Sequence, residues 1–147
     1  MKTVLGIDHG DARIGVAVSD SLRFLAHPVE TVAARPAAAA MERLAEIFRQ
    51  CDTGEVVLGL PIRQDGTEGP SAEKVRAFAA KLGARLPAGT PIHFHDEYGT
   101  TKEAAANLRA AGCKARTHRS VIDQAAAVVI LQEWLDVHAT PSGIKPP

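Results

Sequence analysis

The sequence predicts an α/β domain built on a mixed five-stranded sheet, antiparallel over its first three strands and parallel after them, with helices on both faces. Two observations support this fold class. Apolar runs rich in β-branched residues open the chain in close succession, and further runs then alternate with segments of helical periodicity. The length of 147 residues suits one domain whose core needs no disulfides.

The antiparallel part of the sheet comes first. Strands are expected at residues 3–7 and 13–19, and the segment 9–12 between them is typical of a tight turn. These two strands therefore form a hairpin. A third strand is expected at residues 24–32, ending before Pro36, which cannot donate to a sheet ladder.

The parallel part of the sheet follows. Helix 37–50 carries apolar residues at spacings of three and four. The later elements are strand 56–60, helix 71–86, strand 91–95, helix 100–111 and helix 120–137. Residues 1–138 are expected to form the single domain, and the Pro-rich residues 139–147 to form a loose tail.

The charges of the chain balance, with 17 basic and 17 acidic residues. This balance argues against a protein that holds nucleic acid by its overall charge. Residues 104–122 nevertheless contain no acidic residue and carry Arg109, Lys114, Arg116 and Arg119. Two interpretations stay open: a helix end whose cations complement the negative C-terminal dipole, or an edge that contacts phosphates.

Cysteine usage and hydropathy predict a cytoplasmic protein. Cys51 and Cys113 are far apart and fit no metal-ligand spacing, so we expect free thiols. The N-terminal residues lack a secretory apolar region. No apolar run approaches the roughly 20 residues needed to cross a bilayer, so no membrane span is expected.

Three acidic residues stand near the expected ends of elements, where a solvated surface would not place them. Asp8 ends the first strand, Glu97 comes just past strand 91–95, and Asp123 lies near the start of helix 120–137. At helical spacing, Asp123 shares a stripe with apolar residues that should face the sheet. If the three carboxylates meet at one edge, their repulsion requires divalent cations. Hard oxygen ligands favour Mg²⁺ or Mn²⁺ over zinc.

Each carboxylate also has a plainer interpretation. Asp8 fits a turn before Gly10, Glu97 fits an exposed loop, and Asp123 fits a capping box with Ser120. Their joint placement at element ends favours a functional site. Such a trio supports phosphodiester hydrolysis with two metal ions, which activate the attacking water and stabilise the leaving oxygen.

Histidines offer a second metal-binding hypothesis. His93 and His95 alternate along one strand and so point to the same face, and His9 could join them as soft-metal ligands. Alternating histidines on a strand are more often ordinary edge or core residues. One of them could instead line the carboxylate site as a proton shuttle.

Four segments occur in order along the chain: "GIDHGDARIGVAVSD", "VVLGLPIRQDGTEGPSAEKVRAFAAKL", "HDEYGTT" and "VIDQAAAVVILQEWL". In this order and spacing they resemble the bacterial YqgF family, also called RuvX, over nearly the whole chain. The resemblance implies a ribonuclease H-like fold and a role in maturation of the 5′ end of 16S ribosomal RNA. Through the family's similarity to junction resolvases, it also implies cleavage of branched DNA.

The resemblance implies roles for particular residues as well. Asp8, Glu97 and Asp123 match the family's metal-binding catalytic carboxylates, so Mg²⁺ or Mn²⁺ is the implied cofactor. Arg13 matches the arginine that follows the first glycine turn. The segment 59–69 matches a family loop whose glycines would let backbone N–H groups approach a phosphate.

The chain departs from the family pattern near Glu97. Tyr98 and Gly99 stand where the family has an arginine and a bulky apolar residue, so a phosphate clamp is lost. Arg63 stands in the neighbouring loop where the family usually has Asn, and it could restore the positive charge. These changes bear on substrate preference, because the metal-binding trio is intact.

Two other function classes remain open. The segment "GIDHG" is also similar to the first phosphate loop of actin-like ATPases and sugar kinases, although those proteins close two domains on a nucleotide. A non-catalytic RNA-binding assembly factor would bind without cleaving, but an aromatic content of 4% offers no stacking platform. The expected partners are an RNA precursor or branched DNA, with ribosomal particles and a homodimer as further candidates, since symmetric cutting of two strands needs two active sites.

Overall fold

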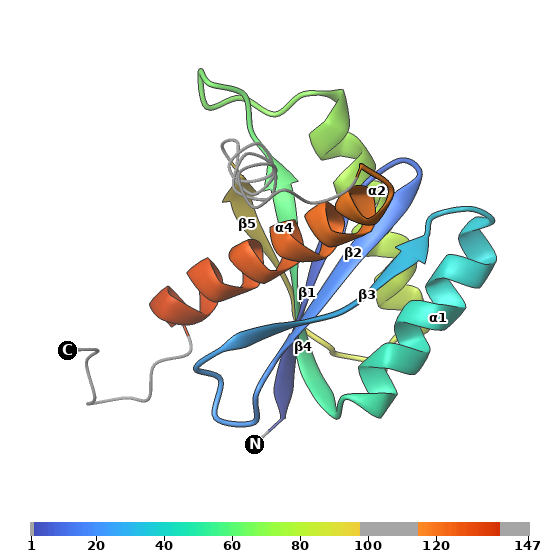
Figure 1. Cartoon of the computed structure of the whole chain (residues 1–147), viewed down its shortest axis with the longest axis vertical. Helices are drawn as coiled ribbons and strands as arrows, with labels where there is room; N and C mark the ends of the chain where they lie inside the picture. The colour runs from blue at the N-terminus through green and yellow to red at the C-terminus, as the bar shows by residue number, and fades with distance from the viewer. Residues whose placement is uncertain (1, 98–114, 139–147) are drawn as a thin grey trace.

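One mixed sheet organises the molecule (Figure 1). The computed structural model describes residues 2–97 and 115–138, with the backbone alone for residues 115–123. The strand order is β3-β2-β1-β4-β5, with the bounds Thr3–His9 (β1), Arg13–Ser19 (β2), Ala26–Ala33 (β3), Thr53–Pro61 (β4) and Ile92–Glu97 (β5). The β1–β2 and β2–β3 pairs are antiparallel, whereas β1–β4 and β4–β5 are parallel. The predicted mixed five-stranded sheet is confirmed.

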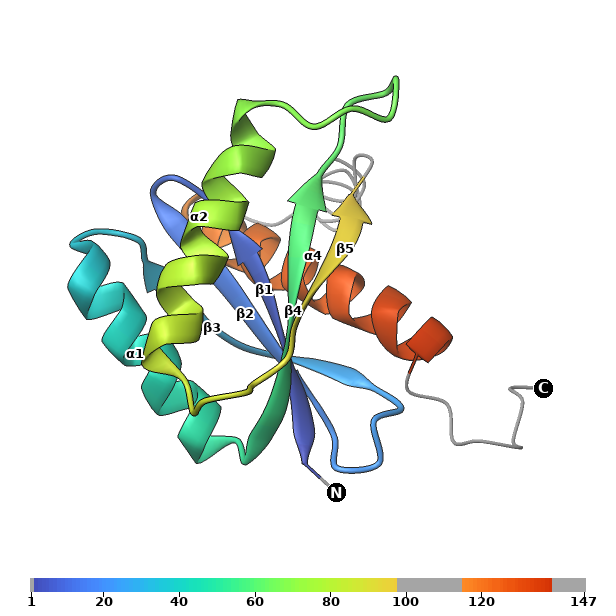
Figure 2. The same ribbon diagram turned by 180° about the vertical axis from the view of Figure 1, so that it is seen from behind.

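Helices cover both faces of the sheet, as predicted. Figure 1 shows α4 (Ala115–His138) across one face, and Figure 2 shows α1 (Ala37–Gln50) and α2 (Pro70–Arg85) on the other. The helix expected at residues 100–111 and the tail expected at 139–147 lie outside the described residues. Within the ranges that the structure describes, none of the helices has the length and hydropathy that a bilayer span requires.

The starts of three strands differ from the sequence-based expectation, with β5 beginning at Ile92, one residue later than expected. β3 begins at Ala26 rather than at residue 24, because the Asp20 carboxylate accepts the Phe24 N–H at 2.7 Å and turns the chain before the strand. β4 begins three residues earlier than expected, since Thr53 already pairs with Thr3 of β1. Tertiary pairing therefore recruits polar residues that the hydrophobic pattern leaves out.

The ends of β1 and β5 lie two residues beyond the expected positions. His9 pairs with Ile14 of β2, and Glu97 pairs with Pro61 of β4, so both strands are hydrogen-bonded to their last residue. α1 has the expected bounds, and α2 lies one residue earlier than expected. α4 begins at Ala115, five residues before the expected start.

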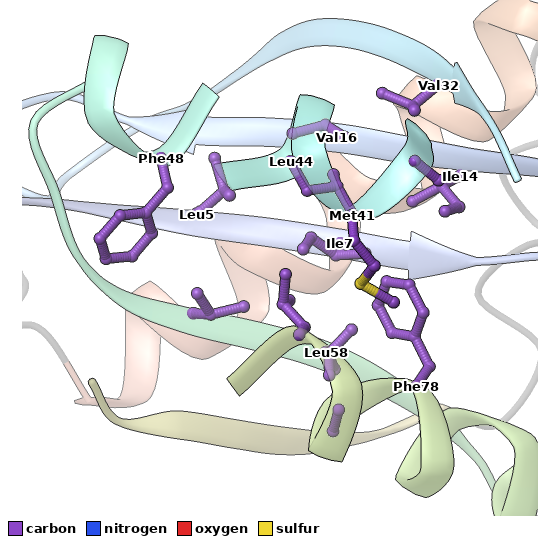
Figure 3. Packing of buried hydrophobic residues seen from close by; sticks show 14 of the residues in the cluster. Leu5, Ile7, Ile14, Val16, Val32, Met41, Leu44, Phe48, Leu58 and Phe78 are labelled. Atoms are coloured by element: carbon purple, nitrogen blue, oxygen red, sulfur yellow. The ribbon is translucent and has the colours of Figure 1, made fainter. Parts of the chain in front are cut away.

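Two hydrophobic layers hold the helices on the sheet. Figure 3 shows the layer under α1 and α2, where alternate strand residues meet one face of each helix, including Leu5, Ile7, Val16, Leu44, Phe48 and Leu58. The residues between them in β1, β2 and β4 face α4, where they pack with its apolar stripe: Val4, Ala17, Val57, Ala127, Ile130, Leu131, Trp134 and Leu135. Burial of each large apolar side chain contributes roughly 1.5–3 kcal/mol, so both layers stabilise the sheet.

The contact between α4 and the centre of the sheet is close because Gly6 has no side chain. A Cβ atom on Gly6 would lie 2.6 Å from Leu131 Cβ and 3.2 Å from the Ala127 carbonyl oxygen. Real Cβ atoms do not approach other heavy atoms as closely as the first distance. The glycine therefore lets the helix backbone approach β1 directly.

A polar cluster near the amino-terminal ends of β4 and β5 links these strands to α4. The Arg23 guanidinium donates to Glu55 Oε2 at 2.5 Å, and a His93 ring nitrogen lies 3.1 Å from Glu55 Oε1. The Trp134 ring packs on His93, with centroids 5.0 Å apart. Burial raises the pKa of Glu55, but the bonds from His93 and Arg23 outweigh it and leave the pKa below its usual value.

Gly6→Ala should destabilise the fold, because the added methyl group would meet Leu131 and the backbone of α4. Overpacking of this kind costs roughly 1–3 kcal/mol of unfolding free energy. Gly83→Ala is the matched control in α2, since its Cβ would meet only Ile92 Cδ1 at 3.5 Å and would gain helix propensity. Urea unfolding measures both variants, and an unchanged midpoint for Gly6→Ala would contradict the close contact.

Candidate functional site

The carboxyl ends of the parallel strands β1, β4 and β5 meet at one edge of the sheet, which lies at the top of Figure 1. Asp8 is the penultimate residue of β1 and pairs with Gly15 of β2. Because Gly6 faces α4 and strand residues alternate, the Asp8 side chain lies on the α4 face. The turn interpretation of Asp8 is therefore wrong, because this half-buried residue belongs to a paired strand.

Glu97 brings a second carboxylate to the same edge. It is the last residue of β5, and its carbonyl oxygen accepts the Ile62 N–H at 3.2 Å. Its Oε2 lies 3.0 Å from the position that a Cβ on Gly59 would occupy, so the carboxylate stands over Gly59 on the α4 face. The exposed-loop interpretation of Glu97 is wrong, since strand pairing and partial burial hold it in place.

Asp8 and Glu97 come together across Gly59. One residue beyond the Ile7–Leu58 pair, Asp8 lies beside Gly59 in the neighbouring strand. Because the Glu97 carboxylate stands over Gly59, it lies above the strand next to Asp8 and on the same face of the sheet. Gly15 pairs with Asp8 in β2, and Gly59 follows Leu58, the partner of Ile7, in β4, so neither neighbouring strand places a side chain of its own next to Asp8.

The backbone of α4 brings Asp123 toward this edge. The Gln132 side chain accepts the Ala26 N–H at 2.9 Å, and Gln124 donates to Thr31 Oγ1 at 3.1 Å, so α4 runs antiparallel to β3. Thr31 lies near the end of β3, at the same edge as the end of β1. Asp123 immediately precedes Gln124 in the helix and is therefore carried to the edge that holds Asp8.

The start of α4 corrects one interpretation of Asp123. Ser120 and Asp123 both lie inside the helix that begins at Ala115, so they do not form a capping box. A capping box requires the serine at the position before the first helical turn. Asp123 instead occupies the ninth position of the helix, on the stripe that continues through Ala127 and Ile130.

The donor set at this edge fits a hard divalent cation. Carboxylate oxygens such as those of Asp8 and Glu97 are the ligands that Mg²⁺ and Mn²⁺ prefer. Within residues 2–97 and 124–138, no group of three His, Cys, Asp or Glu side chains could hold a metal ion. Asp123 lies outside those ranges, on the helix that covers this face of the sheet.

The histidines divide between the two faces of the sheet. His93 and His95 share the α4 face, where His95 Nε2 lies 3.1 Å from Glu133 Oε1. His9 faces the opposite way, and its ring centroid lies 4.5 Å from that of Phe78 in α2. A metal site that combines all three histidines is therefore wrong.

Two of the predicted phosphate-binding cations lie close to the carboxylate edge. Arg13 starts β2 and shares the α4 face with Asp8, because it stands two residues before the Gly15 that pairs with Asp8. Arg63 lies in the β4–α2 loop, where its guanidinium packs against Gly69 with Nε 2.8 Å from the position of a Cβ there. The base of that loop is the strand end bonded to Glu97.

The other predicted cations belong to the segment before and within α4. Arg116 and Arg119 lie in the first two turns of the helix. A helix N-terminus carries positive partial charge, so cations there gain nothing from the dipole. The C-terminal dipole interpretation is therefore wrong for these two residues. Arg109 and Lys114 lie outside the described residues.

Gly59 has a packing role that differs from the one implied for the glycines of segment 59–69, which was to let backbone N–H groups approach a phosphate. A Cβ on Gly59 would lie 2.5 Å from Ile130 Cδ1 as well as 3.0 Å from Glu97 Oε2. The glycine therefore serves close packing beneath α4 and beneath the carboxylate, in the interior of β4. A glycine inside an otherwise apolar strand is the signal that marks such an approach.

Comparison with known proteins gives a family match over most of the chain. The family model described as "RuvX: Holliday junction resolvase" matches residues 2–137. A relative from Streptomyces avermitilis, named as a candidate pre-16S rRNA nuclease, is 53% identical over 132 residues, which cover 90% of this chain and 84% of the relative. A relative of the same name from Anaeromyxobacter sp. (strain K) is 45% identical over 139 residues, covering 95% and 99% of the two chains.

Solved resolvase structures share the fold. T. thermophilus RuvC in complex with a Holliday junction substrate superposes with a TM-score of 0.52 at 18% identity, covering 90% of this chain and 92% of that chain. Fowlpox virus resolvase, also in complex with Holliday junction DNA, has a TM-score of 0.51 at 10% identity and coverages of 90% and 98%. At these identities the likeness establishes the architecture alone.

The titration of His9 tests the charges at the end of β1. Burial lowers the pKa of His9, the Asp11 carboxylate acts to raise it, and the Lys74 ammonium group acts to lower it. Asp11→Asn should therefore lower the His9 pKa further, and Lys74→Gln should raise it, as followed by NMR of the ring protons. Shifts in the same direction for both variants would contradict this arrangement.

The lowered pKa of His9 also has a consequence for stability. Below a pH of about 6.5 the unfolded chain takes up a proton on His9 before the folded chain does. The free energy of unfolding should therefore decrease as pH falls below that value, and His9→Gln should reduce this decrease in urea titrations. An identical pH dependence in wild type and variant would show that His9 does not contribute.

Proposed function

Because the chain belongs to the RuvX family and is a nuclease with a ribonuclease H-like fold, we propose that it hydrolyses phosphodiester bonds in the precursor of 16S ribosomal RNA. The observation that carries this proposal is the meeting of Asp8 and Glu97 across Gly59, at the carboxyl edge of the sheet. The names of relatives that are 45–53% identical support the RNA substrate. Branched DNA is the second candidate, because the family model is described as a junction resolvase.

Asp8, Glu97 and Asp123 are the proposed ligands of the divalent cations, Mg²⁺ or Mn²⁺. The hard carboxylate donors and the glycines beside Asp8 support this assignment. A pair of such cations, when bound, activates water and neutralises charge on the leaving oxygen. The part of the protein is to hold the carboxylates in place: Asp8 through the β1 ladder, and Glu97 through its pairing with β4.

The basic residues near the edge are the proposed contacts of the sugar-phosphate backbone. Arg13 shares the face of Asp8, and Arg63 stands on the loop whose base bonds to Glu97. Guanidinium groups bind phosphate oxygens in a bidentate manner, so these residues would orient the strand without selecting its sequence. Arg116 and Arg119, with Arg109 and Lys114, would extend this path along the start of α4.

The assembly and location of the protein follow from the substrate proposed. Residues 1–138 would act as a single nuclease domain in the cytoplasm, on ribosomal precursor particles. A branched DNA substrate would instead require a homodimer, since symmetric cutting of two strands needs two active sites. A monomeric active species would therefore count against the branched DNA substrate.

Asp8→Asn and Glu97→Gln should each abolish most cleavage, because each removes a charged donor from the proposed metal site. Mutation of groups behind metal ligands already costs about 10- to 100-fold, so we expect a loss of at least about a hundredfold. The assay compares a 5′-extended 16S precursor RNA, a four-way DNA junction and ATP, each with Mg²⁺ or Mn²⁺. Glu133 lies on the same face of the sheet, beside His95. The variant Glu133→Gln is therefore the matched control and should retain activity.

The outcomes of this assay separate the function classes. Cleavage that disappears in Asp8→Asn supports the nuclease, and the preferred nucleic acid identifies its substrate. Hydrolysis of ATP in place of nucleic acid would favour an actin-like phosphate site. Binding of RNA without cleavage in either metal would favour an assembly factor and overturn the proposed reaction.

Gly59→Ala should reduce cleavage without removing a charge. The added Cβ would lie 3.0 Å from Glu97 Oε2 and 2.5 Å from Ile130 Cδ1, so the carboxylate must move. A displacement of about 1 Å can cost roughly a hundredfold in rate, and we expect a fall in kcat of about 10- to 100-fold. Gly83→Ala serves as the control, and an unchanged kcat in folded Gly59→Ala would contradict the proposed position of Glu97.

A further inference from the structure

A cavity of about 250 Å³ opens between α1 and α2, on the face of the sheet opposite Asp8. Small side chains leave this space open, since its walls include Ala34, Ala37, Ala40 and Ala77. Figure 3 shows Met41 and Phe78, which border it from the two helices. The hydrophobic layer beneath α1 and α2 is therefore incomplete at the end nearest the carboxylate edge.

Two rings line this cavity. His9 of β1 and Phe78 of α2 have ring centroids 4.5 Å apart and an interplanar angle of 37°. The His9 imidazole packs at a tilt beside the Phe78 ring, and both rings face the cavity. Paired rings beside small apolar side chains provide the surface that a planar heterocycle prefers.

The charged residues of the cavity are cations. Lys74 and Lys81 lie seven residues apart on one face of α2 and border the opening. Lys74 Nζ lies 3.2 Å from Asp11 Oδ1, an exposed pair that is readily exchanged for another anion. Among the described residues that line this cavity, none is acidic. An apolar space bordered by two ammonium groups is complementary to a planar ligand that carries a negative charge.

A second hollow adjoins this cavity, and the exposed Asp11 that pairs with Lys74 is among its lining residues. It has a volume of about 200 Å³, shares His9 and Lys74 with the first, and extends along Gly10, Pro61 and Ser71. His9 follows Asp8 in β1, so the two hollows begin one residue from the proposed catalytic carboxylate, on the other face of the strand. A ligand in the cavity would therefore lie beside the end of β1, next to the edge where a nucleic acid strand is proposed to bind.

We propose that this cavity binds a nucleotide, with its base against His9 and Phe78 and its phosphate near Lys74 and Lys81. This inference rests on the proposed function, because a nuclease supplies nucleotides either as part of its substrate strand or as free products. The volume of about 250 Å³ lies below the roughly 300–1,000 Å³ of pockets for drug-sized ligands, so it suits the base of one nucleotide, with the sugar and phosphate at the opening beside the lysines.

Binding measurements with Asp8→Asn protein in EDTA test this proposal without cleavage. The probes are adenosine monophosphate and a labelled single-stranded RNA of about eight nucleotides, together with versions of that RNA carrying one abasic position each. Ala77→Leu fills the cavity and Lys81→Gln removes a cation, and both residues are exposed enough for the fold to tolerate the change. Ala80→Leu in the same helix and Lys2→Gln at the far edge of the sheet are the matched controls.

Ala77→Leu should weaken binding of the monophosphate about tenfold, Lys81→Gln should weaken it several-fold, and the controls should leave it unchanged. The His9 ring resonances should shift when the monophosphate binds. If the Asp8→Asn protein binds one of the abasic RNAs more weakly than the intact RNA, and this difference disappears when Ala77→Leu is added, the bound nucleotide belongs to the substrate strand. If Ala77→Leu weakens binding of the monophosphate but not of the RNA, the cavity binds a free nucleotide.

Equal affinities of Ala77→Leu and its control for both probes, with no shift of His9, would overturn the proposal. Cleavage by the wild-type protein is measured separately with metal. A protein that cleaves but shows no effect of Ala77→Leu retains the proposed function and loses the cavity assignment. A protein that binds the monophosphate in the cavity but cleaves no nucleic acid loses the proposed function instead.

Discussion

The approach of α4 to the sheet at two glycines determines the geometry of the carboxylate edge. A Cβ atom on Gly6 would lie 2.6 Å from Leu131 Cβ, so a larger residue there would push the helix away from the sheet. A Cβ atom on Gly59 would lie 2.5 Å from Ile130 Cδ1 and would displace that side chain. Packing density in protein interiors leaves no room to absorb such a change locally. Gly59 also leaves the space in which the Glu97 carboxylate stands, and the distance of α4 from the sheet determines how near the backbone of Asp123 comes to it.

The position of the carboxylates at a strand edge limits the cost of bringing like charges together. Asp8 and Glu97 are half-buried, so water at the edge still solvates part of each carboxylate. Two residues further into the strands, the corresponding positions are Gly6 and His95, and α4 covers Gly6 completely. Carboxylates at that depth would lose hydration without access for a solvated cation, which explains why the acidic residues collect where the parallel strands end.

The sequence predicted the bounds of an element well where helix-terminating residues flank it. One example is α1, which lies between Pro36 and the positive-φ residue Asp52. The prediction was wrong at the end of β5, because strand pairing carries the charged Glu97 into the sheet. It was also wrong at the start of α4, because the polar residues 115–119 show no apolar periodicity. The candidate carboxylates could be proposed from their positions near element ends. Their distances could not, since the placement of Glu97 depends on the contact over Gly59.

Side chains alternate between the two faces of β1, so Asp8 and His9, which are neighbours in the sequence, lie on opposite faces of the sheet. Asp8 turns toward α4 and the other carboxylate, whereas the next residue turns toward Phe78 and the lysines of α2. The β4–α2 connection touches both sets, because Ile62 donates to the Glu97 carbonyl while the neighbouring Pro61 lines the hollow beside His9. A strand of nucleic acid that crosses this edge would therefore meet acidic groups on one face and cationic groups on the other. The proposed reaction and the proposed capture of a neighbouring nucleotide would then lie on opposite sides of one β-strand.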